Sequence, residues 1–191
     1  MGRLILVLGG ARSGKSSYAE KQARELGGDS VLYVATSEAK DDEMATRIAR
    51  HRAARPPAWG AVEAPRSVAQ VIRQARSAEE VIVVDCITFL VANHLLAAAG
   101  PGDDPFDAPS ADPFDESIEA DVVADVEALA AYAREQDVTM LAVSNEVGLG
   151  LVPAYELGRA YRDILGRANQ VLARHADEVL LLVAGIPMKV K

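Results

Sequence analysis

Five short apolar runs recur along the chain and alternate with longer amphipathic stretches. The runs lie at residues 3–8, 30–35, 80–85, 138–143 and 178–184. Each is almost wholly apolar, as is typical of strands that are buried on both faces of a parallel sheet. The last run is expected to close the sheet. The alternation predicts a three-layer α/β domain with a mainly parallel central sheet and helices on both faces.

Helices are predicted at residues 17–26, 41–55, 67–76, 117–135 and 154–174. The first ends at a Gly-Gly pair, a signal for a helix C-terminus. The second begins with acidic residues and ends before a Pro-Pro pair. Residues 59–65 are expected to form a short connection. No element is assigned to the segment after Asp85, although Thr88 and Asn93 are expected near the same edge of the sheet.

Between the first run and the first helix lies a sequence that fits the phosphate-binding loop G-x-x-x-x-G-K-[ST] without a mismatch. It consists of Gly9, Gly10, Ala11, Arg12, Ser13, Gly14, Lys15 and Ser16. The glycines allow backbone N–H groups to point at phosphate oxygens, and the helix that follows adds its positive dipole end. Lys15 should reach the β- and γ-phosphates, and the Ser16 hydroxyl should ligate Mg²⁺. The strand and helix on either side disfavour a glycine-rich turn without chemical role.

Other polar residues stand where predicted strands end. Thr36 and Ser37 follow the second run, and Asp85 ends the third. Ligands bind at the carboxyl ends of strands in open α/β sheets, so these residues are expected at the active-site edge. Asp85 matches the acid that holds Mg²⁺ in P-loop enzymes, directly or through water. A turn role for Thr36 and Ser37, and a capping role for Asp85, stay open as alternatives.

The predicted helix at 41–55 carries one histidine among arginines. Arg47, His51 and Arg55 share a helical face, and Arg50 and Arg52 flank them. Guanidinium groups can hold a polyphosphate, and their positive field favours the neutral imidazole, the form that attacks phosphorus. From the residues alone, a solvated basic helix end is the favoured interpretation.

Three further stretches carry polar or unusual sequence. Residues 144–150 follow the fourth run and are expected to form a substrate-contacting loop. Residues 100–116 are rich in Pro and acids and contain Asp-Pro-Phe-Asp twice, so we expect a loop insertion. A mobile excursion is the favoured interpretation, with a lid over the substrate as the alternative. Arg159 and Arg162 are expected to face solvent, with phosphate contact as the alternative.

Composition limits the partners. The chain has 191 residues, enough for a single domain, and a net charge of −8. This charge disfavours broad binding to nucleic acid or anionic membranes. The single cysteine, Cys86, fits a reducing compartment and core packing. Without a signal peptide or an apolar run of membrane-spanning length, we expect a cytoplasmic protein with no membrane insertion.

Taken together, several stretches resemble the family of bifunctional adenosylcobinamide kinases/adenosylcobinamide-phosphate guanylyltransferases. The likeness spans nearly the whole chain in the right order. The stretches are residues 9–16, 33–37, 42–44 with 47–48, His51 with 55–56 and Trp59, 145–150 with 152–153, and 185–186 with 189–191. The phosphate loop alone is shared by many enzymes, whereas the His51 and Asn145 segments are much more specific.

The resemblance implies a P-loop NTPase-like, RecA-like fold and two reactions. The family phosphorylates adenosylcobinamide with ATP or GTP and then transfers GMP from GTP to adenosylcobinamide phosphate, with release of diphosphate. It implies that His51 is the nucleophile that carries GMP, that Lys15 is catalytic, that Mg²⁺ assists at Ser16 and Asp85, and that the protein is a homotrimer. Nucleotide contacts are implied for the phosphate loop, Ala35, Thr36, Ser37, Arg52, Ala53, Ala54, Arg55, Glu63 and Asp85.

Two rival interpretations stay open. A simple P-loop kinase would have no need for His51, and its activity would survive His51→Ala. A non-catalytic nucleotide-dependent switch would bind GTP without turning over cobinamide.

Overall fold

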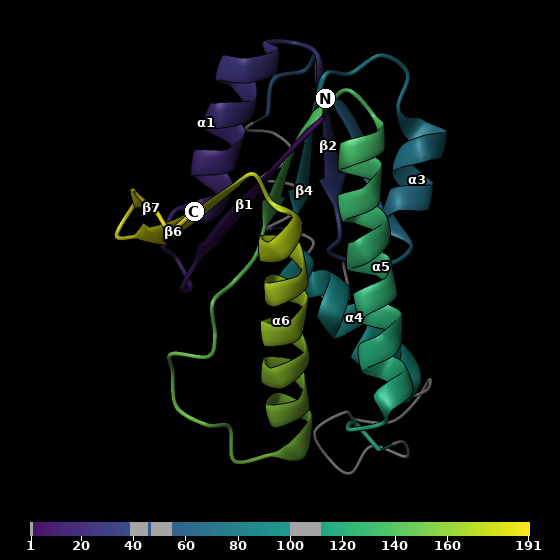
Figure 1. The fold of residues 1–191 in the computed structure, drawn as a ribbon, viewed down its shortest axis with the longest axis vertical. Helices are drawn as coiled ribbons and strands as arrows, with labels where there is room; N and C mark the ends of the chain where they lie inside the picture. Colours follow the sequence, from purple (N-terminus) through teal and green to yellow (C-terminus); the bar gives the residue numbers. More distant parts are fainter. Residues whose placement is uncertain (1, 39–45, 47–54, 100–111) are drawn as a thin grey trace.

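The computed structural model of the chain describes residues 2–38, 46, 55–99 and 112–191. Its centre is a seven-stranded sheet with the order β3-β2-β4-β5-β1-β6-β7 (Figure 1). The strands are β1 (Arg3–Gly9), β2 (Val31–Ala35), β3 (Gly60–Glu63), β4 (Val81–Asp85), β5 (Thr139–Val143), β6 (Glu178–Val183) and β7 (Ile186–Lys189). All neighbouring strands pair in parallel except β6 and β7, which are antiparallel.

Helices cover both faces of the sheet. They are α1 (Lys15–Gly27), α3 (Val68–Ala75), α4 (Ile87–Ala99), α5 (Glu116–Glu135) and α6 (Glu156–His175). Figure 1 shows α5 and α6 side by side in front of the sheet, with α1 apart from them. Residues alternate along β1: Leu4 and Leu6 join the core with α3 to α6, while Ile5 and Val7 join the core with α1. Burial on both faces explains why the strands are continuous apolar runs.

The predicted fold class is confirmed. The sheet is parallel through six strands, it lies between two helical layers, and the phosphate loop joins β1 to α1. β5 lies between the phosphate-loop strand β1 and the Asp85 strand β4, which is the arrangement of RecA-like P-loop domains.

Three elements were not predicted. Residues 60–63 form β3 instead of a connection, and residues 186–189 form β7, so β6 does not close the sheet. Both are four-residue edge strands, and β7 contains a proline, which is tolerated only at edges. The segment after Asp85 is α4, which is apolar on nearly all sides and therefore lacks the periodicity of an amphipathic helix.

Other expectations lie partly or wholly outside the described residues. Of the predicted helix at 41–55, the structure describes only Thr46 and Arg55. Most of the 100–116 insertion also lies outside the described residues. The end of that insertion is described, and Asp115 there is the N-cap of α5. No helix in the described ranges combines the length and apolarity needed to cross a membrane.

Candidate active site

The strand register brings predicted site residues from separate parts of the chain to one edge of the sheet. Ala35 on β2 pairs with Glu63 on β3 and with Asp85 on β4. Asp85 pairs in turn with Val143 on β5, which pairs with Val7 on β1. The phosphate loop begins two residues beyond Val7. The carboxyl ends of five parallel strands thus form one edge that carries the loop, Ala35, Glu63 and Asp85.

The phosphate loop has a backbone that requires glycine at two positions. A Cβ at Gly9 would lie 2.5 Å from Ser13 Oγ and 2.7 Å from the Leu182 carbonyl oxygen. Gly14 precedes α1 with a φ of 92°, a left-handed conformation. Arg12 is also left-handed, with a φ of 55°. The loop therefore turns sharply into the N-terminus of α1, the end of a helix that attracts phosphate.

Lys15 is held at this turn. Its Nζ donates a hydrogen bond of 2.6 Å to the carbonyl oxygen of Gly10, and its side chain is buried in the first turn of α1. Burial lowers the pKa of Lys15, while the electrostatic interactions with Cys86 and Asp85 act in the opposite direction. An ammonium group with few water contacts gains more from a bound phosphate than an exposed lysine would.

Two segments that are distant in sequence support the loop. The Glu146 N–H donates to the Gly9 carbonyl at 3.0 Å, and the Gly185 N–H donates to the Ser13 carbonyl at 2.9 Å. The second contact comes from the tight turn between β6 and β7, where Ala184 and Gly185 both have positive φ. Sequence reasoning missed this support because it assigned no strand after residue 184.

Asp85 interacts with Tyr33 and is close enough to Lys15 to affect its pKa. Its Oδ2 accepts a hydrogen bond of 2.6 Å from the Tyr33 hydroxyl. No cluster of three or more His, Cys, Asp or Glu side chains suited to a metal occurs in the part of the chain that the structure describes. Mg²⁺ at phosphate sites takes one or two protein ligands together with the phosphates and water. One carboxylate, from Asp85, and the Ser16 hydroxyl at the start of α1 fit such a site.

Thr36 has a structural role in this fold. Its Oγ1 donates to the Cys86 carbonyl at 2.6 Å and accepts from the Cys86 N–H at 2.7 Å, and the residue is fully buried. The hydroxyl joins the ends of β2 and β4. Ala35 and Ser37 are partly exposed on either side, and Glu63 is exposed. Nucleotide contact by these four residues stays a prediction.

Arg55 contacts protein groups at the same edge. Its guanidinium carbon lies 3.3 Å from the centroid of the Tyr33 ring, and its Nε lies 3.8 Å from Glu20 Oε1 on α1. The predicted roles of Arg47, Arg50, His51, Arg52, Ala53 and Ala54 fall outside the described residues and stay predictions.

The loop after β5 is fixed at its root by buried polar groups. Asn169 on α6 donates to the Asn145 carbonyl at 2.9 Å and accepts from the Ser144 hydroxyl at 2.6 Å. The Asn145 N–H donates to Thr88 Oγ1 on α4 at 3.0 Å. Beyond this root the loop turns Leu149 and Leu151 outward. The segment 144–150 is thus anchored beside the phosphate loop, as its place after a strand predicts.

Arg159 and Arg162 contact protein atoms. Arg159 Nη1 donates to the Ala154 carbonyl at 2.7 Å, and the Arg162 guanidinium donates to Asp163 Oδ1 at 3.2 Å. Both side chains are partly exposed. Cys86 is buried, and burial raises the pKa of its thiol to about 11. A thiol that stays protonated suits core packing and not nucleophilic attack.

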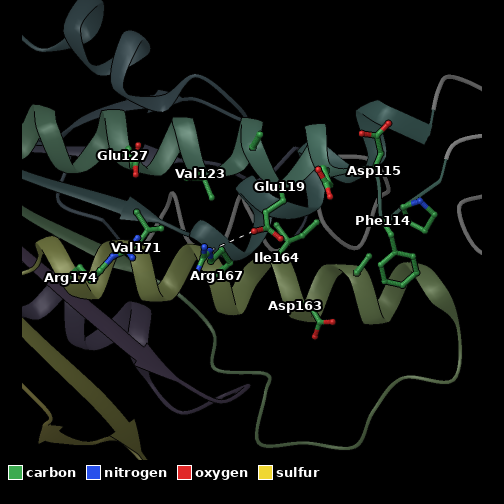
Figure 2. A pocket seen from close by; sticks show the side chains of 14 residues that line it. Phe114, Asp115, Glu119, Val123, Glu127, Asp163, Ile164, Arg167, Val171 and Arg174 are labelled. Atoms are coloured by element: carbon green, nitrogen blue, oxygen red, sulfur yellow. Dashed lines mark ion pairs between the residues drawn. The ribbon is translucent and has the colours of Figure 1, made fainter.

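A pocket opens between α5 and α6 (Figure 2). Glu119 and Arg167 form an ion pair of 3.6 Å across it, and Phe114 and Ile164 contribute apolar surface. None of the residues predicted to contact nucleotide or metal lines this pocket, so it does not belong to the site described above.

Comparison with known proteins identifies the family. The family described as cobinamide kinase / cobinamide phosphate guanyltransferase matches residues 5–190, nearly the whole chain. The chain belongs to this family. "Bifunctional adenosylcobalamin biosynthesis protein CobU" of Escherichia coli (strain K12) is 44% identical over 191 residues, covering 98% of this chain and 99% of the relative. The protein of the same name from Salmonella typhimurium (strain LT2) is 43% identical over 190 residues, with the same coverage.

Membership confirms the resemblance seen in the sequence and the prediction of a bifunctional cobinamide kinase and cobinamide phosphate guanylyltransferase. Among solved structures, the flagellar accessory protein FlaH from Methanocaldococcus jannaschii aligns with 100% of this chain and 78% of its own, with a TM-score of 0.47 and 15% identity.

Proposed function

We propose that this protein phosphorylates adenosylcobinamide with ATP or GTP and then transfers GMP from GTP to the new phosphate through a guanylylated His51. The observation that carries the proposal is the strand register, in which Asp85, Ala35 and Glu63 share one edge with the phosphate loop. One nucleotide site at that edge can serve both reactions.

In the kinase step, the loop N–H groups and Lys15 hold the β- and γ-phosphates. The substrate hydroxyl attacks the γ-phosphorus, a new P–O bond forms, and the bond to the leaving nucleoside diphosphate breaks as the hydroxyl proton departs. Lys15 balances the charge that develops on the transferred and leaving oxygens. Mg²⁺, held by Ser16 and Asp85, supplies further charge neutralisation when bound.

In the transfer step, an imidazole nitrogen of His51 attacks the α-phosphorus of GTP. A P–N bond forms, and the bond to diphosphate breaks. A phosphate oxygen of the substrate then attacks the same phosphorus and displaces His51. Two displacements at a neutral imidazole replace one difficult displacement. Support comes from the arginine-rich sequence around His51 and from Arg55, which lies against Tyr33 beside Asp85.

The homotrimer is part of this proposal. Support comes from β7, an edge strand on which Ile186 and Met188 are exposed. Exposed apolar strands at a sheet edge are commonly covered in an assembly. Light scattering of the purified protein measures the subunit number directly, and a monomer at micromolar concentration contradicts this part.

Measuring the two half-reactions separately tests the function. Phosphate transfer to adenosylcobinamide is followed with γ-labelled ATP or GTP, and diphosphate release is followed with GTP and adenosylcobinamide phosphate. We expect His51→Ala to reduce diphosphate release at least about 1,000-fold, as loss of a nucleophile does. His175→Ala, at the end of α6, is the matched control and should keep both activities. Equal diphosphate release by His51→Ala and wild type would rule out the guanylylated His51, and a wild type that releases no diphosphate would be only a kinase.

A further inference from the structure

Tyr33 lies between two residues that the proposed function uses. It is 2% exposed, and its hydroxyl donates to Asp85 Oδ2 at 2.6 Å. Tyr33 pairs in register with Val83, two residues before Asp85, so both side chains project from the same face of the sheet. The short distance is typical of a charge-assisted bond to a carboxylate. Sequence reasoning gave Tyr33 no role, because a buried aromatic residue in a strand has core packing as its ordinary explanation.

The ring of Tyr33 has a second partner. The Arg55 guanidinium lies over it at 3.3 Å, and the same group faces Glu20 of α1 at 3.8 Å. The Arg55 side chain is 11% exposed, so the cation sits between β2 and α1 with little water. Cation–π attraction is strongest for such desolvated pairs. Arg55 is also one of the residues predicted to contact the nucleotide, so its position bears on the proposed function.

We propose that Tyr33 is a positioning residue for the nucleotide site, its hydroxyl orienting Asp85 as a ligand for Mg²⁺ and its ring holding Arg55, a predicted nucleotide contact. This inference rests on the proposed function. A carboxylate has two oxygens, and the bond to Tyr33 fixes the plane of the group while using one of them. Second-layer hydrogen bonds of this kind typically raise metal affinity 10- to 100-fold.

Two substitutions distinguish the role of the Tyr33 hydroxyl from the role of its ring. Tyr33→Phe removes the bond to Asp85 and keeps the surface that Arg55 covers, whereas Tyr33→Leu removes both. Tyr132→Phe is the matched control, because Tyr132 is also 2% exposed and also lies beside an arginine, Arg73, at 5.2 Å. Tyr132 is on α5, in the core on the other face of the sheet.

The first readout is binding of a fluorescent, non-hydrolysable GTP analogue during titration with Mg²⁺. We expect Tyr33→Phe to raise the Mg²⁺ concentration for half-maximal binding about 10-fold and Tyr132→Phe to leave it unchanged. A purely structural role of Tyr33 would not move this quantity in a folded variant. Equal Mg²⁺ requirements for Tyr33→Phe and wild type overturn the role of the hydroxyl.

The second readout is the rate of GMP attachment to the protein from GTP at saturating Mg²⁺, measured by intact mass. Tyr33→Phe should match wild type, and Tyr33→Leu should be about 10-fold slower because Arg55 loses its platform. Equal rates for the two variants overturn the role of the ring. If Tyr33→Leu does not fold, Arg55→Met replaces it with the same expectation. If wild type forms no adduct, the guanylyl-histidine proposal fails, and the Mg²⁺ titration still tests the hydroxyl.

Discussion

On the face covered by α3 to α6, buried polar side chains bond mainly to backbone groups, whereas on the face covered by α1 the group around Tyr33 interacts through its side chains. Asp125 on α5 accepts from the N–H groups of Ser67 and Val68 at 2.7 and 3.0 Å. Asn93 on α4 donates to the carbonyls of Thr36 and Pro65 at 2.8 and 3.0 Å. These groups fix where segments of the chain lie.

On the α1 face, the buried polar side chains have different partners, and the described residues include a buried hydroxyl without a hydrogen bond. Tyr33, Asp85, Arg55 and Glu20 interact through side chains. In the described part of the chain, Ser13 Oγ in the phosphate loop is buried without a hydrogen-bond partner. A buried unpaired polar group is costly unless a ligand satisfies it. The comparison teaches that substitutions on the α1 face should change activity, whereas those on the other face should change stability.

The largest effect is expected for Lys15→Ala. Loss of the cation that is proposed to bind the phosphates should lower kcat/KM of both steps by about 100- to 1,000-fold. The free energy of unfolding should not fall, because burial already disfavours the charged form of this lysine. Steady-state kinetics and urea unfolding measure the two quantities. Lys21→Ala, on an exposed position of α1, is the control, and equal losses in both variants would contradict the role of Lys15.

Asp125→Ala, in contrast, is expected to lower stability and to leave activity unchanged. The variant leaves two backbone N–H groups at the start of α3 without their acceptor and removes the partner of His94, 3.2 Å away. We expect the free energy of unfolding to fall by about 3 kcal/mol. The folded fraction should keep its kcat. Asp121→Ala, exposed one turn earlier on α5, should change stability by less than about 0.5 kcal/mol. A loss of kcat in folded Asp125→Ala would contradict the assignment of activity to the α1 face and of stability to the other face.

Thr36 has a structural role according to its hydrogen bonds, whereas the family resemblance implies that it contacts the nucleotide. Thr36→Val removes both bonds to Cys86 and should cost about 2 kcal/mol of stability, whereas Thr36→Ser keeps the hydroxyl and should cost less. Unfolding curves measure the difference. A variant Thr36→Val that stays stable and binds GTP weakly would support the nucleotide contact implied by the family and would contradict a structural role.

The smallest effect concerns Asp115, the N-cap of α5. Hydrogen bonds from the N–H and side chain of Ser117 lower the pKa of Asp115 below its ordinary 3.8. A lower pKa in the folded state means that the ionised form stabilises the fold above pH 3.8, and that this contribution is lost as the pH falls through the folded value. Asp115→Ala should therefore lower the urea midpoint slightly at pH 7, and by progressively less as the pH falls below 3.8. A pH-independent difference contradicts the ionised cap.

Much of the fold could be predicted because its main strands are continuous apolar runs that end in recognisable loops. The elements that escaped prediction lack such a signal. β3 and β7 have four residues each, and α4 has no polar face. The sheet order could not be predicted, because β1 is flanked by β5 and β6, which lie far from it in sequence.

The position of a site residue was predictable where a motif places it at the start of a helix, as with Lys15, or at the end of a strand, as with Asp85. Contacts across the sheet could not be predicted. The bond from Tyr33 to Asp85 joins residues 52 positions apart, and the contact from Gly185 to Ser13 joins the two ends of the chain. Both depend on register, which the sequence pattern does not specify.

The central claim is that His51 carries GMP between the two substrates. The measurement that tests it most directly is the intact mass of the protein after incubation with GTP and Mg²⁺, beside His51→Ala. We predict a gain of one GMP in wild type only, and its loss on addition of adenosylcobinamide phosphate. No adduct on wild type, with phosphorylation of adenosylcobinamide intact, would contradict the account.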